Sequence, residues 1–190
     1  MRVIKYSQAE TASKSTVQLN FKTVNQLLDL DDPSPYPHKE LTEVAEYAIA
    51  SHVGDVPIKK DVELVLSLPS GAQSGEIQEN LAETIRQHFA FRATEAALEV
   101  ARKKARLKLG IKITIALIAI VILAGGVIAL IPVGDDPRVI KALIGGILTI
   151  LVWAGVWDLF EAYAIEYRDL VIKMKVYEKV ARMNMRIEQA

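Results

Sequence analysis

Three histidines are the first side chains to consider for chemistry: His38, His52 and His88. None has a second histidine or a carboxylate at the spacing of a zinc site. The chain contains no cysteine, which excludes disulfides, thiolate metal sites and cysteine nucleophiles. Three acidic side chains crowd one loop without the residue order of a calcium loop, namely Asp29, Asp31 and Asp32. Because Asp before Pro is common turn chemistry, we expect no metal and no cofactor.

The segment 70–75, Ser-Gly-Ala-Gln-Ser-Gly, precedes a predicted helix start, where an anion could bind. It lacks the Lys-Ser/Thr pair of a phosphate loop, so helix capping explains it. Neither a Gly-x-Ser-x-Gly motif nor a dinucleotide fingerprint occurs. We therefore predict that the protein is not an enzyme.

Asp158 and Glu161 form the most notable polar pair, because they lie three residues apart where a long apolar run ends. An ionisable group inside a bilayer would indicate function. Counting about 20 residues from Pro137 places the pair at the membrane interface instead. The interpretation without a specific function is an ion pair with Lys108 or Lys112 of the neighbouring helix.

Two apolar runs of membrane-spanning length stand in the second half of the chain, at 113–131 and 139–157. We predict transmembrane helices at 111–132 and 139–160, joined by an external turn at 133–138 that is rich in Gly, Asp and Pro. The turn is too short for anything but antiparallel neighbours. A buried core helix of a soluble protein is the alternative, but too few amphipathic elements exist to cover it.

The distribution of positive charge predicts the orientation of this hairpin. Residues 1–101 carry nine Lys/Arg against fifteen Asp/Glu, and residues 102–190 carry fourteen against eight. Lys and Arg gather before the first run and after the second, so both termini should be cytoplasmic. We expect a prokaryotic inner-membrane protein that contacts anionic lipid and binds no nucleic acid.

Small residues recur at four-residue spacing in both runs, which favours close helix packing in lipid. They are Gly125, Ala129, Ala142, Gly145, Gly146 and Thr149. The packing could occur within one chain or between copies.

The remaining residues predict a small α+β domain in the cytosol, at 1–75. Residues 1–15 are polar and patternless, alternating apolar residues predict strands near 17–21 and 62–68, and helical spacing between them ends at Gly54. Amphipathic helices should follow at 76–110 and 161–190, continuous with the two spans. The predicted fold is thus an α+β membrane protein: a β-α-β unit followed by two long helices that form a transmembrane hairpin. Because two strands and one helix bury too little to be stable alone, the unit must pack on the long helices or on another copy.

A stiff loop joins the first predicted strand region to the helix, with prolines that fix the backbone. Its candidate docking residues are Asp32, Pro33, Ser34, Pro35 and Tyr36. The loop could simply aim the following helix, or it could present Tyr36 to a neighbouring subunit.

Several runs resemble a family of uncharacterised prokaryotic proteins with two membrane spans. They are residues 21–29 (Phe-Lys-Thr-Val-Asn-Gln-Leu-Leu-Asp), the Asp-Pro-Ser-Pro loop at 32–35, Leu41, the Ala-Glu-Tyr-x-Ile run at 45–49, Leu-Pro at 68–69, and His-Phe-Ala-x-Arg at 88–92. The resemblance implies the two-span architecture and supplies no mechanism.

We therefore expect a non-enzymatic, homo-oligomeric membrane protein whose cytosolic domain serves assembly or the docking of a protein partner. The alternative is a small oligomeric ion channel or transport subunit. Against it, the spans offer little polar lining beyond Thr114 and Thr149, although an apolar ring could gate by dewetting.

Overall fold

The computed structural model describes residues 5–11, 14–69, 75–130 and 137–189. It consists of two units, which we call the folded domain (Met1–Ala97 with Val171–Ala190) and the hairpin (Leu98–Leu170). The predicted anion loop at 70–74 and most of the predicted external turn, residues 133–136, lie outside the described residues.

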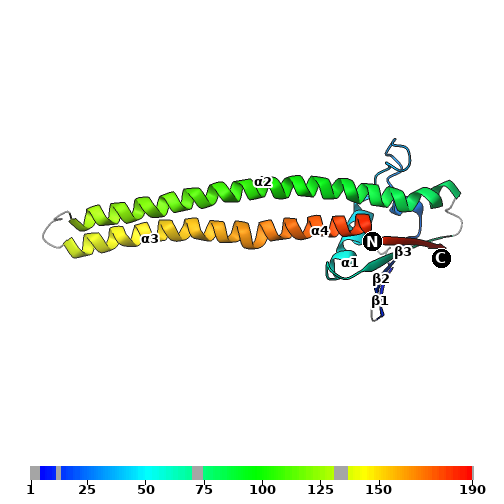
Figure 1. The fold of residues 1–190 in the computed structure, drawn as a ribbon, viewed down its shortest axis with the longest axis horizontal. Helices are drawn as coiled ribbons and strands as arrows, with labels where there is room; N and C mark the ends of the chain where they lie inside the picture. The colour runs from blue at the N-terminus through cyan, green and yellow to red at the C-terminus, as the bar shows by residue number, and fades with distance from the viewer. Residues whose placement is uncertain (1–4, 12–13, 70–74, 131–136, 190) are drawn as a thin grey trace. The chain divides into compact units, whose positions relative to one another are not determined.

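The folded domain contains a four-stranded sheet in the order β1-β2-β3-β4 (Figure 1). The strands are β1 (Lys5–Thr11), β2 (Lys14–Asn20), β3 (Val62–Leu68) and β4 (Asn184–Gln189). β1 and β2 form an antiparallel pair, whereas β3 runs parallel to both β2 and β4. The helix α1 (Glu43–Gly54) lies between β2 and β3 in the chain. The predicted β-α-β unit is therefore confirmed.

One end of each long helix belongs to the folded domain. α2 spans Gly75–Leu130, and the second long helix consists of α3 (Pro137–Glu161), a π-helical segment (Ala162–Tyr167) and α4 (Arg168–Arg182). The core combines apolar residues of β2 and β3 with residues of α2 and α4, including Leu81, Ile85, Phe89, Val176 and Val180. One chain thus covers its own sheet, and the small unit needs no second copy for that purpose.

Two sequence predictions are wrong at the ends of the chain. The polar stretch 1–15 has no predicted strand or helix, but residues 5–11 form β1, although their sequence shows no apolar alternation. Residues 161–190 are not a helix throughout, because α4 ends at Arg182 and β4 follows. Met185 and Ile187 alternate and pack against the core, which is strand spacing rather than helical spacing.

The hairpin packs α2 against α3 along a seam that several contacts place in register. Lys103 forms an ion pair with Glu166. A Cβ on Gly110 would lie 2.9 Å from Cδ2 of Leu159, and one on Gly155 would lie 3.8 Å from Oγ1 of Thr114. Leu107 and Thr114 are buried in this seam. In these contacts the residue number in the second long helix falls as the residue number in α2 rises. The two helices are therefore antiparallel neighbours.

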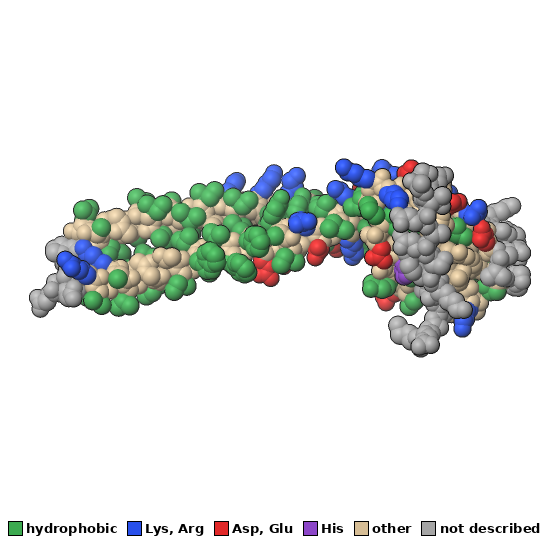
Figure 2. Space-filling model, turned by 90° about the horizontal axis from the view of Figure 1, so that it is seen from below, with side chains coloured by type: hydrophobic (Ala, Val, Ile, Leu, Met, Phe, Trp, Pro, Cys, Tyr) green, Lys and Arg blue, Asp and Glu red, His purple; other side chains and the backbone are tan. Residues whose placement is uncertain are grey.

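Both long helices are long and apolar enough to cross a membrane, over Asn80–Leu130 and Arg138–Arg182. Their most apolar windows of 18 residues have mean hydropathies of 2.9 and 2.2, and none of either window is buried within the chain. A core helix of a soluble protein would be mostly covered, so burial does not explain this apolarity. Figure 2 shows hydrophobic side chains along the hairpin, with Lys and Arg side chains at its left end, beside the residues drawn in grey, and again farther along the helices.

Among the described residues, none of the predicted glycines Gly125, Gly145 and Gly146 closely approaches the other helix. All six predicted small-residue positions are exposed, and a Cβ on Gly125, Gly145 or Gly146 would meet no described atom within 4 Å. The hydroxyl of Thr149 donates to the carbonyl of Gly145 in its own helix at 2.8 Å. Packing between copies remains a prediction. The glycines that do approach the other helix are Gly110 and Gly155.

A larger residue should therefore have different effects at a glycine that faces the other helix and at an exposed glycine. Gly155→Leu is expected to overpack the seam and destabilise the hairpin by about 1–3 kcal/mol, because Leu117 and Thr114 lie opposite. Gly146→Leu should leave the unfolding of a single copy unchanged and reduce the mass of the detergent-solubilised particle. Thermal unfolding and light scattering of both variants measure this, and a lower melting temperature for Gly146→Leu in a monomeric particle would contradict it.

Candidate functional site

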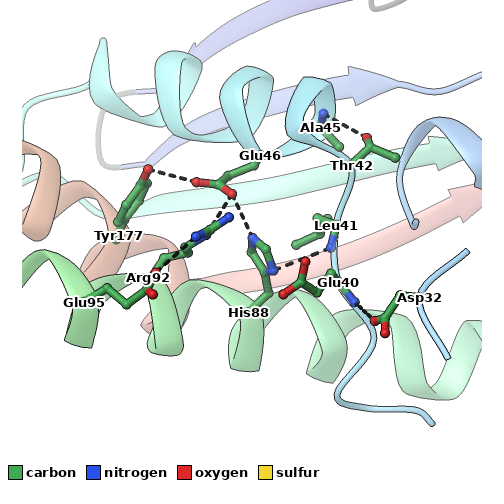
Figure 3. A network of polar contacts seen from close by, with 10 residues as sticks. All are labelled: Asp32, Glu40, Leu41, Thr42, Ala45, Glu46, His88, Arg92, Glu95 and Tyr177. Carbon is green, nitrogen blue, oxygen red and sulfur yellow. Dashed lines mark hydrogen bonds and ion pairs between the residues drawn. The ribbon is translucent and has the colours of Figure 1, made fainter. Parts of the chain in front are cut away.

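The carboxylate of Glu46 is the centre of a polar cluster inside the folded domain (Figure 3). Thr42 caps the N-terminus of α1 by accepting from the backbone N–H of Ala45, which sets Glu46 in the first turn. One oxygen, Oε2, accepts from Nε2 of His88 at 3.1 Å and from Nε of Arg92 at 3.0 Å. The other, Oε1, accepts from the hydroxyl of Tyr177 at 2.9 Å. The cluster thus joins α1 to α2 and α4.

Each of the two ring nitrogens of His88 has its own hydrogen-bond partner. Its Nδ1 accepts from the backbone N–H of Leu41 at 3.5 Å, so the proton of the neutral ring lies on Nε2 and is donated to Glu46. The side chain is 5% exposed, and its ring contacts Phe89 edge-on. His88 is therefore a buried connector between the loop end at Leu41 and Glu46.

The cluster strongly favours the ionised form of Glu46. The hydrogen bond from His88 is the largest influence on its pKa, burial opposes it, and Tyr177 and Arg92 act in the same direction as His88. The result is a pKa lowered from 4.5 to about 2. Burial lowers the pKa of Arg92, but the carboxylates of Glu95 and Glu46 outweigh that effect and raise it overall.

This arrangement is suited to holding segments together. The carboxylate of Glu46 is 15% exposed and already accepts three hydrogen bonds, and the Nδ1 lone pair of His88 is occupied. Neither group offers a free basic atom to a substrate. Among the described residues, no group of three or more His, Cys, Asp or Glu side chains could hold a metal ion.

A shallow cavity of about 570 Å³ lies beside the cluster. Its wall includes Arg92, Tyr177, Lys173 and the outer side of α1. The ammonium of Lys173 lies 5.6 Å from the centre of the Tyr177 ring. Tyr47, which is 76% exposed, stands at the rim.

No family model, curated protein or solved structure matches this chain. The resemblance described above is therefore neither supported nor opposed, and the site must be interpreted from its own geometry.

The Asp-Pro-Ser-Pro loop is tied down by Asp32. Its carboxylate accepts from the backbone N–H of Ser34 at 2.9 Å and from that of Glu40 at 2.7 Å. The hydrogen bonds from Ser34 are the main cause of its lowered pKa. Tyr36 is partly buried and packs against the core. These contacts favour the role of aiming the chain towards α1, while Pro33 and Pro35 remain exposed.

The acidic pair on the hairpin, Asp158 and Glu161, is exposed. Among the described residues, Asp158 and Glu161 form no ion pair with Lys108 or Lys112. The pairing expected from sequence within one hairpin is therefore absent. Two other cations reach the neighbouring helix: Lys103 pairs with Glu166, and the ammonium of Lys141 donates to the carbonyl of Ala129 at 2.9 Å.

Sequence reasoning missed the cluster because its members are far apart in the chain. The separation is 42 residues between Glu46 and His88 and 131 between Glu46 and Tyr177. The only local signal was that His88 and Arg92 lie one helical turn apart, so their side chains share a face of α2.

Proposed function

We propose that the protein is a two-span, homo-oligomeric membrane protein of a prokaryotic inner membrane, with its folded domain in the cytosol serving assembly or partner docking. The observation that carries the proposal is that no residue of the two apolar windows is buried within the chain. Exposed aliphatic surface of this extent requires lipid or another protein surface to cover it. The small residues on it suit helix packing between copies. Membership of the two-span family suggested by the Asp-Pro-Ser-Pro loop belongs to the same proposal.

The folded domain supports a binding role more than a catalytic one. Its polar cluster is internally satisfied, whereas Val44 and Tyr47 on the outer side of α1 are 57% and 76% exposed. An aromatic ring beside a shallow cavity is a frequent anchor for a partner protein.

The pore alternative receives less support from the side chains. Thr114 is buried in the seam between α2 and α3, and the hydroxyl of Thr149 is bonded to its own helix. A channel would therefore need an apolar gate rather than a polar lining.

Topology and particle mass test this function together. The chain has no cysteine, so a single introduced thiol is a clean probe. Asp135→Cys should react with an impermeant thiol reagent added outside intact cells, whereas Lys22→Cys, at an exposed position of the folded domain, and Gln189→Cys should react only after lysis. The detergent-solubilised protein should have the mass of several chains. A soluble protein, the reverse labelling pattern or a monomeric particle would contradict the proposal.

A further inference from the structure

The part of the hairpin nearest the folded domain carries opposite charges on its two helices. Residues 98–112 of α2 contain six Lys/Arg and one acidic residue, and residues 158–170 contain four acidic residues and one Arg. Between these two stretches the described side chains form a single ion pair, Lys103 with Glu166. Lys108, Lys112, Asp158 and Glu161 are all exposed. Among the described residues, these opposite charges are therefore largely without an ion-pair partner.

The contacts between the two helices show which charged residues lie at the same position along the hairpin. Gly110 of α2 lies against Leu159 of α3. Because the helices are antiparallel, Lys108, two residues before Gly110, lies level with Glu161, two residues after Leu159. By the same count Lys112 lies level with Trp157, one residue from Asp158. Lys108 thus has an acidic residue at its own level on the other helix, and Lys112 has one within a single residue of its level.

The side chains nevertheless point away from each other within one copy. Lys112 is two positions from both Gly110 and Thr114, which face α3, so it lies on the far side of α2. Glu161 is two positions after Leu159, which faces α2, and lies on the far side of α3. The four charges are arranged as an acidic face on one flank of the hairpin and a basic face on another.

We propose that Asp158 and Glu161 of one copy form ion pairs with Lys112 and Lys108 of an adjacent copy. This inference rests on the proposed homo-oligomer and identifies its contact surface. Copies that are related by rotation about the membrane normal keep every residue at the same depth, so the levels that match within a hairpin also match between hairpins. The acidic flank of α3 then meets the basic flank of α2 in the next copy.

This contact is head-to-tail, because its two surfaces are different. Such interfaces close into rings when the rotation per copy allows it. Opposite charges also fix the register, since a shift along the helices would separate both pairs at once. Exposed Trp157 and Phe160 lie beside Asp158, and their rings are 5.7 Å apart. Exposed Leu109 lies next to Lys108 on α2. The charged pairs are thus flanked by apolar surface that the same contact would cover.

Cross-linking between two differently tagged copies tests the contact directly. Lys108→Cys in one copy and Glu161→Cys in the other are co-expressed and treated with a short bis-maleimide. A product carrying both tags is expected, and neither variant alone should give a dimer. The matched control replaces Lys108→Cys by Arg106→Cys, which lies two positions away on another side of α2. It should cross-link at least tenfold less.

Charge reversal separates the contact from the oligomer itself. Asp158→Lys/Glu161→Lys and Lys108→Glu/Lys112→Glu should each lose the assembled particle, and combining all four changes should restore it. An unchanged particle mass in both double variants, without the mixed cross-link, would overturn the contact and leave the homo-oligomer standing. The two cations would then face lipid headgroups. A monomeric wild-type protein would overturn the contact and the proposed function together.

Discussion

Replacing Glu46 by alanine is expected to destabilise the folded domain by about 3–5 kcal/mol, because it removes the common partner of a buried charge network. Arg92, His88 and Tyr177 all donate to this carboxylate and would lose that acceptor. A domain of this size is stable by only about 5–15 kcal/mol. Hydrogen exchange of the peptides that cover β2 and β3 measures the loss without interference from the hairpin helices.

Glu95→Ala is the matched control for this substitution. Glu95 also accepts from Arg92 at 3.0 Å, but its side chain is 47% exposed. An exposed ion pair contributes about 0–1 kcal/mol. Equal protection of the sheet in both variants would mean that the Glu46 cluster does not hold the three helices together.

The stability of the folded domain should also fall in acid through the same carboxylate. The pKa of Glu46 is lowered from 4.5 to about 2 on folding, so its contribution is complete above pH 4.5 and is lost as the pH falls through 2. At 1.36 kcal/mol per pKa unit the full contribution is about 3 kcal/mol. Urea unfolding followed by the methyl NMR signals of Leu64 and Leu66, at several pH values from 5 to 2, reports on the domain alone.

Glu46→Gln isolates this carboxylate from the other acidic groups. The variant should be less stable than the wild type at pH 5, and the difference between the two should shrink as the pH approaches 2. A difference that stays constant over this range would show that Glu46 titrates normally in the folded state.

Local pattern predicted the elements whose residues repeat with a clear period. Val17 and Leu19 alternate in β2, Leu64 and Leu66 alternate in β3, and the long apolar runs of the hairpin are unbroken. β1 could not be found in this way, because an edge strand can be held by its backbone pairing with β2 alone. β4 was missed because Met183, the residue that follows α4, continues the apolar spacing of that helix in the sequence. The change from helical to strand spacing after Met183 is therefore hard to see.

The polar cluster was beyond local reasoning for a different reason. A carboxylate in α1 gives no sign that a histidine of α2 and a tyrosine of α4 will reach it, since only tertiary packing brings Glu46, His88 and Tyr177 together. For the acidic pair on the hairpin, the residues were found from the sequence but their partners were not. Sequence identified Asp158 and Glu161 as a pair, but assigned them partners within the hairpin that face the other way.

The position of β4 in the sheet has a consequence for biosynthesis. β3 ends at Leu68 and its neighbour β4 begins at Asn184, so the whole hairpin is translated between two strands that pair directly. The sheet can be completed only when β4 has left the ribosome, after both long helices have been made. A nascent chain therefore presents β3 with an open edge throughout synthesis of the hairpin. A premature stop before Asn184 would leave that edge open permanently and ready to pair with another chain.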